Sequence, residues 1–329
     1  MTKQRTLRAL ACVLAMALPA GSRAQTPWSP ERAVEVIVSV SAGGNQDQTA
    51  RLIQSVWQER LAVPSVVVNK SGGGGVIANN YLNQHARDPH YLMLIVPTML
   101  TNRITGAGAN NFSDYTPIAM LFNEYVFVSV RADSPLKTGR DLIQRLRAAP
   151  ETASVAIATA VGNHIHMGIA LPMKAAGVDI KRMTIVPYRS SGESVVALLG
   201  GHVEVVASTF STLAPFVAAG RLRILGVSAP QRMSGPLAAV PTWKEQGAGA
   251  VFDSWRGVVG AKGLGEAQVK YWEKALEAVS QSTEWGKNAE RNFRVNHFMN
   301  GQDAYRYWET QYRELEEALT ELGLAKGLK

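Results

Sequence analysis

Short runs of β-branched and apolar residues alternate along the chain with stretches in which apolar residues recur at helical spacing. This alternation predicts an α/β fold with largely parallel sheets, because parallel strands are joined by a returning helix. The predicted strands are 34–40, 65–69, 91–96, 125–130, 154–158, 184–187, 203–207, 222–227 and 257–260. The predicted helices are 47–58, 76–84, 139–148, 163–176, 193–199, 213–219, 266–280 and 302–321.

The order of these elements predicts two lobes joined by two crossings of the chain. A chain of 329 residues is long for a single core and divides most naturally into two. The loosest stretches suggest that the chain leaves the first lobe near residue 124 and returns near residue 230. We therefore expect 25–124 and 230–329 to form one lobe and 125–229 to form the other, with a hinge between them.

Two glycine-rich loops each lie between a predicted strand and a predicted helix. Four consecutive glycines occupy 72–75, and Gly43 and Gly44 follow the first strand. Residues without Cβ let backbone N–H groups approach a ligand, and the start of a helix adds a partial positive charge. In open α/β sheets, ligands bind beyond the carboxyl ends of the strands. The two loops therefore predict one shared anion-binding cleft.

Asp47 and Arg51 are one helical turn apart at the start of the helix after Gly44. One interpretation is a helix cap with a surface ion pair. The other is that Asp47 braces the loop so that its N–H groups face a ligand. On this second interpretation Asp47 should not itself touch an anionic ligand, because two carboxylates repel.

A third anion site is predicted in the second lobe, where Gly162, Asn163 and His164 open a helix after a strand. Asn163 is a good helix cap, and the free N–H groups beside it can hold an anion. His164 and His166 point to different faces of the helix and have no Glu partner at metal-binding spacing. Packing or ligand hydrogen bonding by His164 is therefore favoured, and we expect neither a metal nor a cofactor.

Polar side chains also gather where the strand 184–187 ends. Tyr188, Arg189 and Ser190 follow it directly, and Arg189 has the planar geometry for bidentate contact with a carboxylate. A solvated turn is the competing interpretation. Ser208 ends the next strand in the same manner.

The first residues predict an export signal. Lys3, Arg5 and Arg8 precede an apolar core at 9–20, and cleavage is expected after Ala24, at a small-x-small site. We therefore expect the mature protein in the periplasm. No later run reaches the roughly 18 apolar residues of a membrane helix.

Removal of this leader changes the cysteine count and the net charge. Cys12 is the only cysteine, so the mature chain has neither a disulfide nor a thiolate metal site. The leader also carries four of the eight net positive charges. The small surplus that remains, without a Lys/Arg block, argues against nucleic acid as a partner and is compatible with an anionic small ligand.

Motifs of hydrolases and nucleotide-binding proteins are absent from the sequence. No G-x-S-x-G string occurs. The glycine run is followed by Val76 and Ile77 instead of the Lys and Ser/Thr of a P-loop, and G-x-G-x-x-G fails at Ile77. An enzyme that uses His164 or His166 as a base remains the least favoured alternative.

Ordered motifs along the mature chain carry a family resemblance. Residues 40–51 match an aromatic-Pro-Pro-Gly-Gly-x-x-Asp-x-x-Ala-Arg string at its Gly, Asp, Ala and Arg positions. Residues 162–166 are similar to a Gly-Ser-x-x-His helix start, 186–189 to Val-Pro-Tyr-Lys, and 199–204 to Leu-Gly-Gly-Gln-Val-Asp. On these motifs the chain resembles the receptor proteins of tripartite tricarboxylate transporters, also called Bug-type periplasmic binding proteins.

The resemblance implies a two-lobed, type II-like clamshell in which each lobe is a mostly parallel sheet flanked by helices. It implies a non-catalytic, monomeric receptor that closes on a small carboxylate and delivers it to membrane permease subunits of a tripartite transporter. A sensor that presents its liganded form to a membrane signalling protein remains the alternative. The expected ligand-binding residues are Ala42, Gly43, Gly44, Asp47, Gly74, Gly75, Thr98, Gly162, Asn163, His164, Tyr188, Arg189, Ser190 and Ser208.

Departures from the family pattern concern the ligand. The aromatic and prolines of the first loop are replaced by Val40, Ser41 and Ala42, and a Phe-Asp pair common at a later strand end reads Ala207-Ser208. Loss of that Asp removes a partner for a ligand ammonium. A plain mono- or dicarboxylate is therefore expected in preference to an amino acid.

Overall fold

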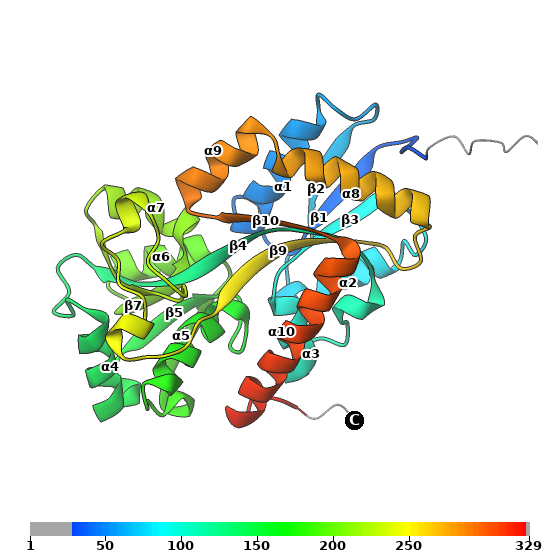
Figure 1. Cartoon of the computed structure of the whole chain (residues 1–329). Helices are drawn as coiled ribbons and strands as arrows, with labels where there is room; N and C mark the ends of the chain where they lie inside the picture. Colours follow the sequence, from blue (N-terminus) through cyan, green and yellow to red (C-terminus); the bar gives the residue numbers. More distant parts are fainter. Residues whose placement is uncertain (1–27, 327–329) are drawn as a thin grey trace, which may run out of the picture.

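A computed structural model describes residues 28–326, and its strands form a continuous, curled arrangement that carries helices on its faces (Figure 1). The predicted leader at 1–24 lies outside the described residues. The strand order is β2 (Ser65–Asn69), β1 (Val34–Val38), β3 (Tyr91–Ile95), β9 (Asp253–Gly260), β4 (Thr116–Arg131), β7 (Val205–Thr209), β5 (Ser154–Ala158) and β6 (Thr184–Tyr188), with β8 (Leu222–Val227) and β10 (Val295–Asn300) also pairing with β4.

Strand β4 belongs to both lobes. It is 16 residues long, and its first part pairs antiparallel with β9 and β10 whereas its last part pairs antiparallel with β7 and β8. The β4–β9 pairs end at Tyr125 and the β4–β7 pairs begin at Val126. The segment between β8 and β9 makes the second crossing. On this pairing we propose the lobe boundaries near residues 124 and 230.

The first lobe packs its helices around β2, β1 and β3, which are parallel. Its core contains fully buried tryptophans, and among them Trp57 and Trp272 have ring centroids 5.4 Å apart. Such rings contribute much of the apolar area that stabilises a fold lacking disulfides. The helices are α1 (Asn45–Trp57), α2 (Val76–Asn83), α3 (Thr98–Thr105), α8 (Glu266–Ser280), α9 (Thr283–Asn292) and α10 (Gly301–Glu321).

The second lobe is built on β7, β5 and β6, which are also parallel. Helix α5 approaches β4 so closely that a Cβ on Gly168 would lie 2.4 Å from the side chain of Val126. Glycine is therefore required there to bring the start of α5 to the seam between the lobes. The helices of this lobe are α4 (Gly139–Ala148), α5 (His164–Ala175), α6 (Ser191–Leu199) and α7 (Phe210–Ala218).

The sequence predictions hold for the outer strands and miss parts of the seam. The predicted strand at 125–130 covers only the second half of β4, whose first half contains the poor strand formers Pro117, Asn123 and Glu124. Strand β10 and helices α3 and α9 were also missed. The strands that pair with β4 along its length are antiparallel to it, because the chain crosses between the lobes in extended form. The parallel arrangement predicted from the sequence therefore describes only the outer strands of each lobe.

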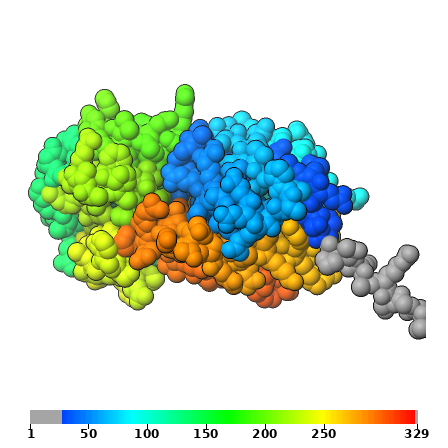
Figure 2. All heavy atoms as spheres, turned by 90° about the horizontal axis from the view of Figure 1, so that it is seen from above, coloured from blue at the N-terminus to red at the C-terminus, as the bar shows by residue number. Residues whose placement is uncertain are grey.

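Seen from above, the green and yellow mass of the second lobe lies against the blue and orange mass of the first (Figure 2). Within residues 28–326, none of the helices combines the length and apolar character that a bilayer crossing needs.

Candidate functional site

A cavity lies where the two lobes face each other. Its volume of about 60 Å³ leaves room for a few water-sized groups and therefore suits a small solute. The walls come from both lobes and are formed by Ser39, Val40, Gly44, Asn45, Gln46, Gly74, Val96, Thr98, Ala158, Thr159, Asn163, His164, Ile165, Ser190, Ser191, Thr209 and Arg256.

Helices from both lobes begin at this cavity. The first residues of α1, α3, α5 and α6 all lie on its wall, and they are Asn45, Thr98, His164 and Ser191, respectively. Helix α7 begins directly after another wall residue, Thr209. The first N–H groups of a helix have no partner within the helix, and the helix dipole places partial positive charge there. The positive ends of several helix dipoles therefore border the cavity, an arrangement that suits an anion.

The two glycine loops reach the cavity through one residue each. The glycines at 72–75 all have positive φ, between 59° and 132°, which only glycine adopts readily. Gly74 lies on the wall, and its carbonyl accepts a hydrogen bond of 2.8 Å from Asn102 Nδ2. In the other loop Gly43 turns the chain at φ 81°, and Gly44 lies on the wall.

Asp47 holds the first glycine loop in shape. Its carboxylate is buried and accepts hydrogen bonds from Gly43 N–H at 2.8 Å, Arg51 Nε at 2.8 Å and Asn69 Nδ2 at 2.9 Å. Burial alone would raise the pKa of Asp47, but these hydrogen bonds outweigh it and hold the pKa below its usual value. Asp47 is not on the cavity wall, and its contacts are those of a brace.

Helix α5 presents His164 to the cavity and turns His166 away from it. The Nδ1 atom of His164 lies 2.6 Å from Thr98 Oγ1 of the other lobe. Desolvation in the closed cleft, together with the charge of Arg256, lowers the pKa of His164 to about 3, so the ring is neutral at neutral pH. His166 Nδ1 instead accepts from Gly162 N–H at 2.9 Å. No group of three or more His, Cys, Asp or Glu side chains in 28–326 is arranged to hold a metal ion.

Six of the residues predicted from the sequence lie on the wall. They are Gly44, Gly74, Thr98, Asn163, His164 and Ser190. The other predicted residues are not on the wall. Those in the loops behind it are Ala42, Gly43, Asp47, Gly75 and Gly162, and the others are Tyr188, Arg189 and Ser208.

The placements of Arg189 and Ser208 have simple causes. Arg189 is exposed in the turn before α6, where its N–H donates to Glu193 Oε2 at 3.2 Å. Ser208 is buried in β7 with its side chain opposite to that of Thr209, because successive strand residues point to opposite faces. Thr209 therefore takes the wall position that the sequence suggested for Ser208.

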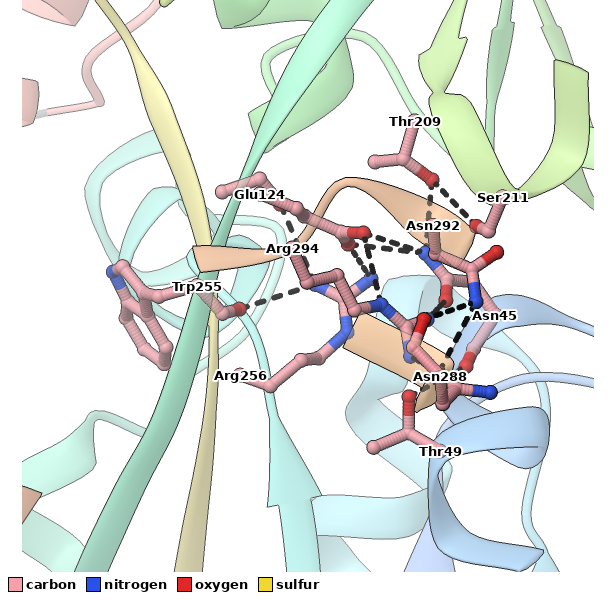
Figure 3. A network of polar contacts seen from close by, with 11 residues as sticks. Asn45, Thr49, Glu124, Thr209, Ser211, Trp255, Arg256, Asn288, Asn292 and Arg294 are labelled. Carbon is pink, nitrogen blue, oxygen red and sulfur yellow. Dashed lines mark hydrogen bonds and ion pairs between the residues drawn. The ribbon is translucent and has the colours of Figure 1, made fainter. Parts of the chain in front are cut away.

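Arg256 of β9 is a wall residue that the sequence reasoning missed. It is the one charged side chain among the wall residues, and it is 2% exposed. It forms an ion pair with the buried Glu124 of β4, and Arg294 Nε lies 3.7 Å from the same carboxylate (Figure 3). A signal was present, because an arginine inside the otherwise apolar strand 255–260 is unusual.

Asn45 connects this ion network to both lobes. Its Nδ2 donates to Glu124 Oε1 at 3.0 Å and to Thr209 Oγ1 at 2.8 Å, and its Oδ1 accepts from Arg294 Nη2 at 2.7 Å (Figure 3). The side-chain amide of Asn45, at the start of α1 in the first lobe, is thus hydrogen-bonded to the end of β7 in the second lobe.

Thr159 is a further wall residue that was missed. It has φ 65°, a left-handed conformation that is strained for a β-branched residue. Asn163 Nδ2 donates to its Oγ1 at 2.8 Å. Local strain of this kind gathers at binding sites, where the surrounding structure holds it in place.

Comparisons with known proteins agree with this geometry. The family model described as "Tripartite tricarboxylate transporter family receptor" matches residues 49–324. A Cupriavidus necator protein, "UPF0065 protein in gbd 5'region", is 28% identical over 311 residues, which cover 94% of this chain and 93% of that one.

Solved structures match over similar lengths. An R. palustris protein solved with adipate is 27% identical with a TM-score of 0.82, and the match covers 90% of this chain and 99% of that one. The periplasmic binding protein BugD is 22% identical with the same TM-score of 0.82 and shares the fold over 90% of this chain and 99% of its own. The two-lobed clamshell predicted from the sequence is thereby confirmed.

Proposed function

The chain belongs to the tripartite tricarboxylate transporter receptor family, and from this premise we propose that it captures a small carboxylate between its lobes and passes it to membrane permease subunits. It is a solute-binding receptor of the periplasmic binding protein class, not an enzyme. We further propose that the leader is cleaved after Ala24 and that the mature receptor acts as a monomer in the periplasm.

One observation carries the choice of ligand class. Helix starts from both lobes border one small cavity, so a carboxylate placed there meets the positive ends of helix dipoles on two sides. Closing the lobes removes water and strengthens each of these contacts. A neutral sugar would gain far less from the same positive field.

The relative solved with adipate supports the same class of ligand, because it is similar in sequence as well as in fold. We propose that the Gly74 N–H and the Ser190 hydroxyl donate to the anion, with Thr98 and His164 closing over it. Gly44 and Asn163 would form the wall beside it, because their N–H groups already donate to Ser41 O and Ala160 O. Contact by Tyr188, Arg189 or Ser208 remains a prediction. The loop residues Ala42, Gly43, Asp47, Gly75 and Gly162 would act by shaping the walls.

A thermal-shift screen tests the proposal. The mature protein is unfolded, dialysed and refolded to remove any bound solute, and is then heated with matched panels of organic acids and uncharged sugars. We expect at least one acid to raise the unfolding midpoint. If a sugar raises it while every acid leaves it unchanged, the carboxylate assignment is wrong.

A further inference from the structure

The charges buried beside the cavity do not balance. Arg256 and Arg294 are 2% and 8% exposed, and Glu124, which is 3% exposed, is the carboxylate paired with both. The other side chains labelled in Figure 3 are uncharged. Two guanidinium groups and one carboxylate leave an excess of one positive charge. An uncompensated buried charge is expensive, so this arrangement favours the arrival of an anion.

Position on the cavity wall shows which arginine a ligand can reach. Arg294 donates from Nη1 to Asn288 Oδ1 at 2.6 Å and from Nη2 to Asn45 Oδ1 at 2.7 Å, and it is not on the cavity wall. Arg256 donates from Nη1 to Trp255 O at 3.1 Å. The Nε atoms of both arginines are buried without a hydrogen-bond acceptor among the described residues, but of the two only Arg256 is on the wall. A buried donor without an acceptor pays its full desolvation penalty. Arg256 is therefore the group that a ligand oxygen would satisfy.

The walls also lack a partner for a ligand ammonium. Neither Asp nor Glu is among the wall residues. Glu124 is already committed to Arg256, Arg294 and Asn45. An amino group in the cavity would meet Arg256 and the positive ends of helices, so a zwitterion would be disfavoured.

We propose that Arg256 is the specificity-determining residue of the cleft and selects a dianionic ligand. One carboxylate of the ligand is held by the helix starts, and the second pairs with Arg256 and balances the buried excess charge. A monocarboxylate can satisfy only one of these two positions. This inference rests on the proposed function and adds to it the number of charges on the ligand.

Two ligand pairs differing in one charge provide the test. Adipate and monomethyl adipate, and in parallel succinate and monomethyl succinate, are titrated calorimetrically into the refolded mature protein. We expect the wild type to bind the better diacid roughly 10- to 150-fold more tightly than its monoester, the range for a hydrogen bond to a charged group. In Arg256→Met this ratio should fall to within about threefold, mainly through weaker binding of the diacid.

Matched variants separate contact from general effects of charge. Arg256→Met leaves Glu124 paired with Arg294, so the network stays balanced and the variant is expected to fold. Arg294→Met removes the same charge from the same network without changing the wall, and should therefore lower the ratio less than Arg256→Met does. Arg189→Met removes an exposed charge outside the network and should keep the wild-type ratio within about threefold. Arg256→Lys keeps the buried charge, and should still lower the ratio at least threefold because the planar fork is lost.

The outcomes distinguish this inference from the proposed function. If the wild type binds diacid and monoester equally, or if Arg294→Met lowers the ratio as much as Arg256→Met does, the role of Arg256 is refuted while carboxylate capture stands. If the wild type binds no organic acid at all, the proposed function itself fails.

Discussion

Thr98 and His164 meet across the cavity from opposite lobes, with Thr98 Oγ1 2.6 Å from His164 Nδ1. The hydrogen bond between Asn45 Nδ2 and Thr209 Oγ1, 2.8 Å long, makes a second link between the lobes. Both links join the two lobes, so we expect them to favour the closed form in the equilibrium between open and closed forms. Because His164 is neutral at neutral pH, the first link does not depend on protonation near pH 7.

Thr98→Val removes the first link without changing the volume of the side chain appreciably. We expect the affinity for the organic acid that binds best in the thermal-shift screen to fall about 2- to 12-fold, which corresponds to the loss of one ordinary hydrogen bond. Small-angle scattering of the ligand-free protein should also give a larger radius of gyration. Thr101→Val is the matched control, since Thr101 Oγ1 donates only within α3, to Thr98 O. Equal losses in the two variants would contradict the role assigned to the cross-lobe contact.

The buried His166 predicts how stability depends on pH. Burial lowers its pKa to about 4, below the value near 6.5 of an unfolded chain. Between these values the unfolded state binds more protons, so the free energy of unfolding falls as the pH drops from about 6.5 to 4. One such group contributes a slope of up to about 1.4 kcal/mol per pH unit.

His166→Asn removes the titration and keeps an acceptor near the N–H of Gly162. Its free energy of unfolding, measured by urea denaturation at pH 4.5, 5.5, 6.5 and 7.5, should have a shallower pH slope than that of the wild type below pH 6.5. Parallel curves for the two proteins would show that His166 is not responsible.

The brace formed by Asp47 predicts a loss of stability in Asp47→Asn. Removal of the charge weakens hydrogen bonds to Gly43, Arg51 and Asn69, at a cost of about 1.5–3 kcal/mol in urea denaturation at pH 7. Because the folded pKa is lowered, this contribution is present above about pH 3.8 and disappears as the pH falls through the folded pKa. Asp133→Asn, at an exposed ion pair with Arg131, should change stability by less than about 0.5 kcal/mol. A similar loss at both positions would argue against the brace.

Gly74→Ala tests the conformation of the second glycine loop. Gly74 has φ 65°, and an L-residue in that region costs about 1–2 kcal/mol. The new Cβ would lie 3.4 Å from Asn102 Oδ1, so the backbone conformation and not a clash should dominate. Gly286→Ala, in open space within α9, should instead stabilise by roughly 0.5–1 kcal/mol. Calorimetric unfolding of both variants measures the difference, and a stable Gly74→Ala protein with normal affinity would contradict the prediction.

The local features of the site could be read from consecutive residues. Four adjacent glycines with positive φ, the Asn163 cap and the Asp47–Arg51 spacing each depend on the conformation of a few neighbouring residues, which the sequence encodes directly. The alternation of strands and helices places those features at the carboxyl ends of strands. The sequence by itself therefore determined the family and the fold class, and it placed several of the predicted site residues on one cavity wall between the lobes.

The side chains that complete the cleft were decided by the tertiary structure. Asn45, Glu124, Arg256 and Arg294 come from four separate segments, and they meet only because β4 runs through both lobes beside β9. Arg189 and Arg256 are equally plausible anion partners in a linear sequence, and Ser208 and Thr209 differ by a single step along a strand. Strand pairing places Arg256 on the wall and not Arg189, and the alternation of strand faces places Thr209 there and not Ser208. Both outcomes depend on contacts between residues far apart in the chain.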